Sequence, residues 1–163
     1  MSGLVQMQPE QMRPFVEGTR EVFETLLRIK LEETHVETKN ASEGTFDLSA
    51  VIGFTGAATG SFVLSSPGET ARAIVGRMLG ARAPVSDQDV ADGMGELVNM
   101  VAGRACQKLG QAGVEGLYLS LPAVIVGRHR VVWPTRDLPC LLMRFFVSEL
   151  GMFSIEVNMR PGA

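Results

Sequence analysis

The sequence has little cysteine, no long apolar run and no large excess of one charge. Its two cysteines among 163 residues form neither a disulfide framework nor a metal-ligand spacing, and they suit a reducing compartment. No stretch reaches the roughly 18 uninterrupted apolar residues of a membrane-spanning helix. The amino-terminal segment lacks a basic stretch followed by an apolar one, so no secretion signal is expected. We therefore expect a cytoplasmic protein without a membrane segment.

The charge balance argues against nucleic-acid binding. Fifteen Lys and Arg against 18 Asp and Glu give a net charge of −3, which provides no basic field for phosphates. A content of 45% hydrophobic and 20% charged residues is typical of globular proteins. The length and the lack of a long linker predict one domain over residues 1–163. Glycine is in excess, with 18 residues against a usual share of roughly 7%.

The first third of the chain predicts a helix followed by a hairpin. Apolar residues return at three- and four-residue steps over residues 8 to about 31, which indicates an amphipathic helix. The polar residues 32–43 form a loop or an exposed edge strand. Residues 51–54 and 61–64 are rich in β-branched and aromatic side chains and flank the turn-forming residues 55–60, which favours a β-hairpin.

Two further helices have clear end signals. In the first, Ser66, Pro67 and Glu69 occupy the N-cap, N1 and N3 positions, and Gly80 ends the helix. The second runs to about residue 109. Its N-cap, its third residue and its terminating glycine are predicted at Ser86, Asp89 and Gly110.

Three apolar runs with strand character, 117–126, 138–147 and 152–159, close the chain. The predicted order is α-β-β-α-α-β-β-β, an α+β fold with helices packed on a largely antiparallel sheet. The helix-then-strands order occurs twice, which hints at an internal pseudo-duplication.

The helix predicted over residues 89–109 has two distinct faces. Asp92, Glu96, Asn99 and Gly103 lie on its polar side, with Glu96 and Asn99 as surface neighbours. The opposite, apolar stripe is expected to pack on the sheet and contains Val90, Met94, Leu97, Val98, Val101, Ala102, Ala105 and Leu109.

Three glycines inside this helix lower its intrinsic stability. Each costs about 1 kcal/mol relative to alanine, so Gly93, Gly95 and Gly103 together cost roughly 3 kcal/mol. Gly95 and Gly103 lie off the apolar stripe, so packing against the sheet does not explain them. We expect them to bare the backbone beside the polar pair so that another molecule can approach closely.

The polar pair suggests phosphoryl chemistry. A carboxylate such as Glu96 pairs with an ammonium group, and a carboxamide such as Asn99 can hold a water molecule in a fixed orientation. Orienting an attacking water is the main requirement of phosphoryl hydrolysis. The remainder of such a site has to come from a partner, because no nucleophile–histidine pair, metal cluster or second carboxylate accompanies the two residues. The pattern E-x-x-N alone is weak evidence, since residues 37–40 also match it and exposed Glu and Asn are usually solvated surface.

Other candidate sites are weaker. The glycines of residues 53–60 lack the Gly-Lys-Ser/Thr ending of a phosphate-binding loop, so a hairpin turn is favoured. His35 and His129 have no nearby ligand set and are interpreted as surface residues. Cys106 and Cys140 are interpreted as small buried hydrophobes.

Residues 92–103, DGMGELVNMVAG, closely resemble the signature helix D-x-x-x-E-[IL]-x-N-[MI]-x-x-G of the CheC/CheX/FliY chemotaxis phosphatases. Other segments resemble the family in the same order, with the resemblance spanning roughly residues 10–160 and closest to the CheX branch. They are GFTG at 53–56 with GSFVL at 60–64, the helix 69–80 ending in MLG, and LSLPAVIVG at 119–127.

The resemblance implies a CheC/CheX-like fold and a phosphatase that dephosphorylates an aspartyl-phosphorylated, CheY-like response regulator in chemotaxis signalling. The E-x-x-N helix would enter the regulator's active site, where Asn99 would orient the water and Glu96 would pair with the regulator's lysine. It also implies that the regulator holds Mg2+ and that this chain binds no cofactor. The residues expected to contact the partner are Asp92, Gly95, Met100, Gly103 and Arg104.

The sequence departs from the family in two respects. CheC-type proteins carry the motif in both duplicated halves, whereas residues 17–24 contain no E-x-x-N. One site per chain fits CheX, which the resemblance implies is a homodimer built by sheet extension. Arg104 stands where the family often has asparagine. Two alternatives stay open: a non-catalytic module that binds a response regulator or joins a switch-complex-like assembly, and a small-molecule enzyme, which the absent motifs disfavour.

Overall fold

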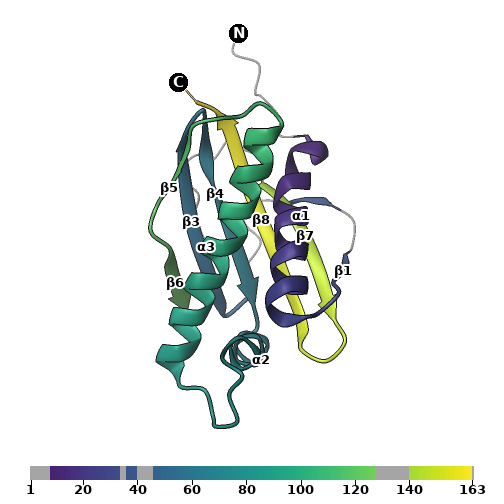
Figure 1. Ribbon diagram of the computed structural model, residues 1–163, viewed down its shortest axis with the longest axis vertical. Helices are drawn as coiled ribbons and strands as arrows, with labels where there is room; N and C mark the ends of the chain where they lie inside the picture. Colours follow the sequence, from purple (N-terminus) through teal and green to yellow (C-terminus); the bar gives the residue numbers. More distant parts are fainter. Residues whose placement is uncertain (1–7, 34–35, 40–45, 128–139, 163) are drawn as a thin grey trace.

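The computed structural model describes residues 8–33, 36–39, 46–127 and 140–162 (Figure 1). It confirms the α+β fold, with helices packed on an antiparallel sheet. The helices are a 3-10 turn Pro9–Met12, α1 Arg13–Val22 continued by a π turn Phe23–Leu27, α2 Gly68–Leu79 and α3 Asp87–Gln111. The strands are β1 Glu32–Glu33, β2 Glu37–Lys39, β3 Leu48–Gly56, β4 Ala58–Ser66, β5 Leu117–Leu119, β6 Ala123–Val126, β7 Cys140–Val147 and β8 Gly151–Pro161.

The strand order has an internal two-fold pattern. Among the described residues the sheet runs β1-β7-β8-β4-β3-β5, with β2 also paired to β7 and β6 also paired to β3. Strands of the first half correspond to strands of the second: β1 to β5, β3 to β7 and β4 to β8. If each strand is replaced by its counterpart, the same order is obtained, read from the other edge of the sheet. Besides α2, each half therefore contributes one helix that packs on the sheet and two long central strands, and its short strands lie on the edge formed by the other half. The topology supports the duplication that the element order indicated.

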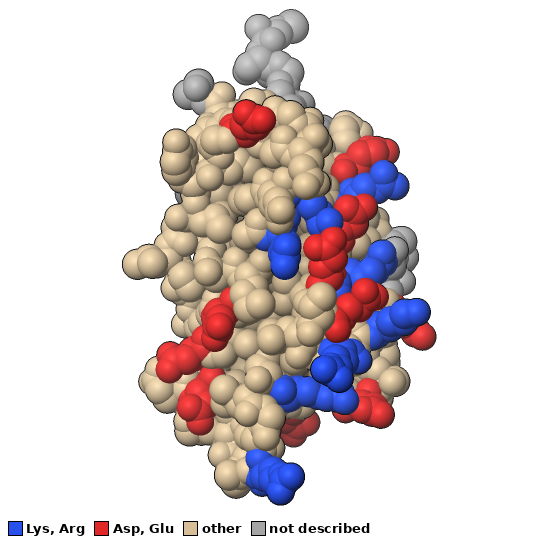
Figure 2. All heavy atoms as spheres, viewed as in Figure 1, with Lys and Arg blue, Asp and Glu red and all other residues tan. Residues whose placement is uncertain are grey.

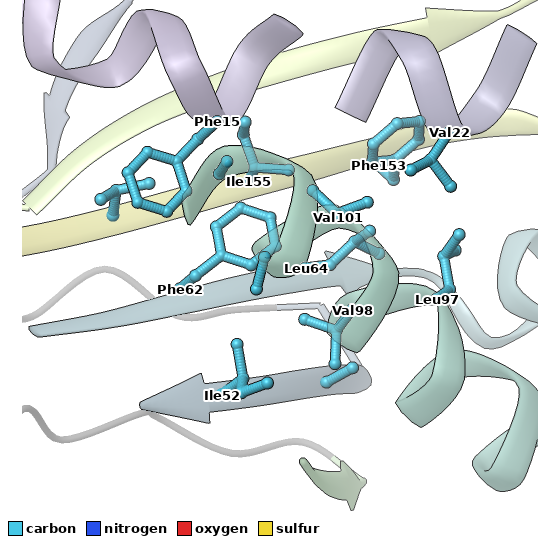
Figure 3. Packing of buried hydrophobic residues seen from close by; sticks show 14 of the residues in the cluster. Phe15, Val22, Ile52, Phe62, Leu64, Leu97, Val98, Val101, Phe153 and Ile155 are labelled. Carbon is cyan, nitrogen blue, oxygen red and sulfur yellow. The ribbon is translucent and has the colours of Figure 1, made fainter. Parts of the chain in front are cut away.

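The core lies between one face of the sheet and the pair α1 and α3. These two helices run side by side, with α2 at one end of the sheet (Figure 1). Figure 3 shows Phe15 from α1 and Val98 and Val101 from α3 converging on Phe62 of β4. The rings of Phe15 and Phe62 stack with centroids 5.5 Å apart. This packing fixes α3 on the sheet and determines which of its sides faces solvent.

The two long helices approach closely at Gly18. A β-carbon there would lie 3.1 Å from both the carbonyl oxygen of Val101 and the amide nitrogen of Ala105. Toward the end of α3, Lys108 forms ion pairs with Glu17 at 3.8 Å and Glu21 at 2.5 Å. The α1–α3 pair is therefore held by apolar packing, by a glycine contact and by charge.

The first helix ends earlier than the predicted residue 31. Its α-helical part stops at Val22 and passes through a π turn to Leu27. Arg28 then takes a left-handed conformation with φ 55°, and the amide of Ile29 donates to the carbonyl of Phe23. The apolar period continues to Ile29, but the backbone no longer follows a helix. The polar segment after it supplies β1 and β2, the edge strand that was one of the two predicted alternatives.

The predicted hairpin is present, but its strands are longer and its turn is shorter. Residues 55–60 were expected to form the turn, yet β3 and β4 pair from Leu48↔Ser66 to Phe54↔Gly60. Gly56 has φ 109°, which gives the chain its reversal beside Ala57.

The predicted strand 117–126 is divided into β5 and β6. The hydroxyl of Ser120 accepts a hydrogen bond from the amide of Gly53 at 2.9 Å, and the amide of Ser120 donates to the carbonyl of Gly53 at 2.8 Å. The Ser120 side chain thus replaces one of the backbone hydrogen bonds between the strands, two residues before Pro122. The strand predicted over 138–147 is confirmed from Cys140 to Val147, and residues 138 and 139 lie outside the described part. The last predicted strand, 152–159, is confirmed, and β8 is longer than predicted at both ends.

The predicted start of α2 is wrong by one residue. Ser66 is the last residue of β4, where it pairs with Leu48, and Pro67 is the N-cap. The amide of Gly68 donates instead to the carboxylate of Asp47 at 2.8 Å. The Ser66 hydroxyl is buried and has no hydrogen-bond partner among the described residues. The predicted end is correct, since Gly80 takes a left-handed conformation there.

Candidate functional site

Local sequence signals account for the position of α3. Ser86 accepts a hydrogen bond from the amide of Asp89 and Asp89 accepts one from the amide of Ser86, both at 3.0 Å, as the predicted capping box requires. The hydroxyl and the amide of Ser86, beside the Asp89 carboxylate, hold the pKa of that carboxyl below its usual value. The helix ends later than predicted, at Gln111 rather than before Gly110. Gly113, with φ 95°, is the terminating glycine.

The predicted apolar stripe of α3 is buried at every position. This confirms the side of the helix that faces the sheet and therefore the side that faces solvent. The eight residues are Val90, Met94, Leu97, Val98, Val101, Ala102, Ala105 and Leu109.

The polar face of α3 points away from the sheet. Glu96 and Asn99 are exposed and lie one turn apart. Neither side chain forms a hydrogen bond or ion pair within the described part of the chain. Asp92, one turn before Glu96, is exposed and accepts a hydrogen bond from the side chain of Gln88 at 2.8 Å. The polar pair is thus presented on a rigid helix with its hydrogen-bonding capacity available to another molecule.

The carboxyl-terminal side of this face is open. A β-carbon at the exposed Gly103 would have no neighbour within 4 Å. Arg104 is exposed and its guanidinium lies 3.4 Å from the amide oxygen of Gln107. Met100 is half-buried and packs against the edge of the core. The expectation that Gly103 bares the backbone beside Asn99 is confirmed.

The same expectation is wrong for Gly95. This residue is buried, and a β-carbon on it would meet Val124 at 3.6 Å and Pro122 at 3.8 Å. The segment from β5 to β6 covers it, which the helical wheel could not indicate. Gly93 also has a packing role, because a β-carbon there would lie 2.7 Å from both γ-methyl groups of Val75 on α2. Of the three glycines, only Gly93 is therefore required by packing.

A groove that the sequence did not predict lies next to Glu96. It has a volume of about 190 Å³ and is formed by the π turn after α1, by α2 and by the first turns of α3. Its apolar walls include two exposed leucines, Leu26 and Leu79, which are 37% and 58% exposed. The full lining is Leu26, Val75, Met78, Leu79, Asp89, Asp92, Gly93 and Glu96.

The charge on this side of the molecule is uneven. Figure 2 shows Asp and Glu without neighbouring Lys or Arg at the lower left, where the amino-terminal half of α3 lies, whereas on the right, over α1, acidic and basic side chains alternate. Two nearby cations are already engaged: Arg72 pairs with Asp87 at 2.5 Å, and Arg77 pairs with Glu149 at 3.7 Å. The start of α3 is therefore an acidic surface.

In the described part of the chain, no group of three or more His, Cys, Asp and Glu side chains is arranged to hold a metal ion. Cys106 is half-buried, and burial raises the pKa of its thiol, while Cys140 is fully buried. His35 and His129 lie outside the described residues. No helix in the described part is both long and apolar enough to cross a membrane.

The second E-x-x-N match does not form a similar site. Glu37 belongs to the short edge strand β2, where its carboxylate pairs with Arg144 at 2.5 Å. Asn40 lies outside the described residues. Within the described chain, the pattern is presented on a helix only at Glu96 and Asn99.

The whole chain is similar to known chemotaxis proteins. CheX from Desulfovibrio desulfuricans is 30% identical, over 93% of this chain and 99% of that one, with a TM-score of 0.84. CheX from Vibrio vulnificus is 27% identical, over 93% and 99% of the two chains, with a TM-score of 0.80. The structure of a CheX-CheY-BeF3-Mg+2 complex from Borrelia burgdorferi matches at 18% identity, over 94% and 99%, with a TM-score of 0.77.

A comparison with curated protein sequences finds no match. The model of the family described as chemotaxis phosphatase CheX, however, matches residues 48–145, which include all of α3 and most of the sheet. Since this match covers more than half of the chain and agrees with the structural similarity, the chain belongs to the CheX family.

Proposed function

We propose that this protein is a phosphatase that accelerates hydrolysis of the aspartyl phosphate on a CheY-like response regulator in chemotaxis signalling. The observation that carries the proposal is the exposure of Glu96 and Asn99 on one face of α3, with the opposite stripe of the helix buried. Membership of the CheX family and the fold shared with the Borrelia burgdorferi CheX-CheY complex support it.

Asn99 would act on the attacking water. Its carboxamide oxygen accepts a hydrogen bond from the water and so directs a lone pair at the phosphorus. The water oxygen attacks opposite the aspartyl oxygen, and the bond between phosphorus and that oxygen breaks. The electron pair returns to the aspartyl carboxylate, and inorganic phosphate carries the protons of the water. Such positioning is the main contribution that a protein makes to phosphoryl transfer.

Glu96 would anchor the helix. Its carboxylate is free to pair with the active-site lysine of the regulator, one helical turn from Asn99. We assign Mg2+ to the regulator, where it would neutralise charge on the phosphoryl oxygens. Asp92, Met100 and Arg104 would contact the regulator around this pair, and the bare backbone at Gly103 would allow close approach.

The decisive experiment measures phosphate release from a CheY-type regulator of the same organism after its phosphorylation with acetyl phosphate. Wild type should accelerate release, and Asn99→Ala should lower kcat by roughly 100-fold while the regulator still binds. Absence of acceleration by wild type, or full activity of Asn99→Ala, would refute the catalytic assignment. Binding without acceleration would instead support a non-catalytic adaptor.

The proposed function also bears on assembly and location. We propose a homodimer formed by sheet extension, for which the β5–β6 edge offers several exposed apolar side chains. They are Tyr118, Leu121, Ile125 and Val126. Light scattering on the purified protein measures the mass directly. Because a response regulator is an intracellular protein, we propose a cytoplasmic location.

A further inference from the structure

The groove beside Glu96 combines features that a solvated surface does not need. Its walls bring together Leu26 from the π turn and Met78 and Leu79 from α2. Leu79 is 58% exposed, although it stands at the end of a helix where a polar residue would be solvated at no penalty. Three apolar side chains from two separate segments thus meet around one hollow.

The rim of the groove is a carboxylate stripe. Asp89, Asp92 and Glu96 follow one another at steps of three and four residues, so they lie along one face of α3. The hydroxyl and the amide of Ser86 beside the Asp89 carboxyl lower its pKa, so Asp89 carries a negative charge at neutral pH. The two arginines of α2 pair elsewhere, Arg72 with Asp87 and Arg77 with Glu149.

The stripe leads directly into the proposed catalytic face. Glu96 lines the groove and also belongs to the polar pair, and Asn99 follows it by less than one turn. If a lysine of a partner protein pairs with Glu96, the partner's surface next to that lysine therefore lies over the groove. Gly93 in the groove floor brings α2 close to α3, so the walls are held at a fixed separation.

We propose that the groove is the second half of the docking site, and that it takes an apolar side chain next to a basic residue on the surface of the phosphorylated response regulator. The inference rests on the proposed function and adds to it the determinant of partner selection. The apolar side chain would be buried between Leu26 and Leu79, and its basic neighbour would lie against Asp89 and Asp92. Binding through the groove is independent of the chemical step, so it governs affinity rather than turnover.

The test separates KM from kcat for the phosphorylated regulator. Leu79→Ser should raise KM by about tenfold, because roughly half of a leucine side chain becomes buried on docking, and should leave kcat unchanged. Asp92→Asn should raise KM less and should weaken the dependence of KM on salt concentration. The matched control is Phe146→Ser on β7, because Phe146 is 57% exposed and does not line the groove.

A binding titration with the regulator loaded with beryllium trifluoride, which mimics the phosphoryl group, repeats the test without catalysis. Leu79→Ser should weaken this binding by the same factor. An unchanged KM and unchanged binding for Leu79→Ser, or an equal effect of Phe146→Ser, would overturn the inference while leaving the proposed function intact. A change in the mass of the free protein on Leu79→Ser would assign the groove to a second copy of the chain and would also overturn it. Wild type that binds the regulator but does not accelerate phosphate release would refute the proposed function alone.

Discussion

Replacing Gly103 should separate the stability of this protein from its activity. Gly103 lies well inside α3, is exposed, and would place a β-carbon in open solvent with no neighbour within 4 Å. Glycine in a helix interior is less favourable than alanine by about 1 kcal/mol. Gly103→Ala should therefore raise the free energy of unfolding by about 1 kcal/mol, and Gly103→Leu by nearly as much. For a chain of this length the corresponding rise in Tm is about 2–4 °C.

The same substitution should lower activity. A leucine at position 103 stands one turn after Asn99, on the face that would enter the regulator. Its side chain would hold the helix away from the phosphoryl group, and a displacement of about 1 Å can reduce the rate roughly 100-fold. We expect kcat/KM to fall between tenfold and 100-fold for Gly103→Leu and much less for Gly103→Ala.

Gly93 provides the matched control in the same helix. Gly93→Ala gains the same helix propensity but places a methyl group 2.7 Å from Val75, an overpacking that costs about 1–3 kcal/mol. It should therefore be neutral to destabilising where Gly103→Ala is stabilising. Urea unfolding and the phosphate-release assay measure both quantities. A Gly103→Leu variant with normal kcat/KM, or a Gly103→Ala variant that loses stability, would refute the explanation given for this glycine.

Two further predictions concern stability. Ser86→Ala removes the N-cap of α3 and should lower the free energy of unfolding by about 1 kcal/mol, measured by urea titration at pH 7. The Ser86 bonds lower the pKa of Asp89 in the folded state, so their contribution is present above the ordinary value of 3.8 and is lost as pH falls below it. Acid titration should show this loss in wild type and a flatter curve in Ser86→Ala. Phe153→Ala should cost about 3–5 kcal/mol, because Phe153 is fully buried and stacks on Phe23 and Phe145 at 4.7 and 5.1 Å. Retention of wild-type thermal stability by Phe153→Ala would contradict this account of the core.

The parts of the structure that the sequence predicted well depend on neighbouring residues. The start of α3 could be predicted from Ser86 and Asp89 alone, which lie three positions apart. Its buried face could be predicted from the helical period alone. The site residues Glu96 and Asn99 follow from the same period, so their exposure could be predicted without knowledge of the fold. The resemblance of residues 92–103 to a known helix then supplied the chemistry.

The errors arose where distant segments determine the local structure. Ser66 has the sequence context of an N-cap, but Leu48 extends the hairpin by one pair and Asp47 supplies the capping carboxylate. On a helical wheel Gly95 lies outside the apolar stripe, which predicts an exposed residue, but Pro122 and Val124 cover it. The groove beside Glu96 went unpredicted for the same reason, since its walls come from three separate segments.

The two-fold pattern of the fold explains why one helix is available for function and the other is not. α1 and α3 occupy corresponding places on the sheet, so each half of the chain could present a polar helix face. On α1 the carboxylates of Glu17 and Glu21 pair with Lys108 of α3, where they join the two helices. On α3, Glu96 and Asn99 lie away from this contact and form no bond within the described residues. Within the described residues, the carboxylates of the first helix are therefore used in a contact between the helices, whereas Glu96 and Asn99 of the second remain available to another molecule.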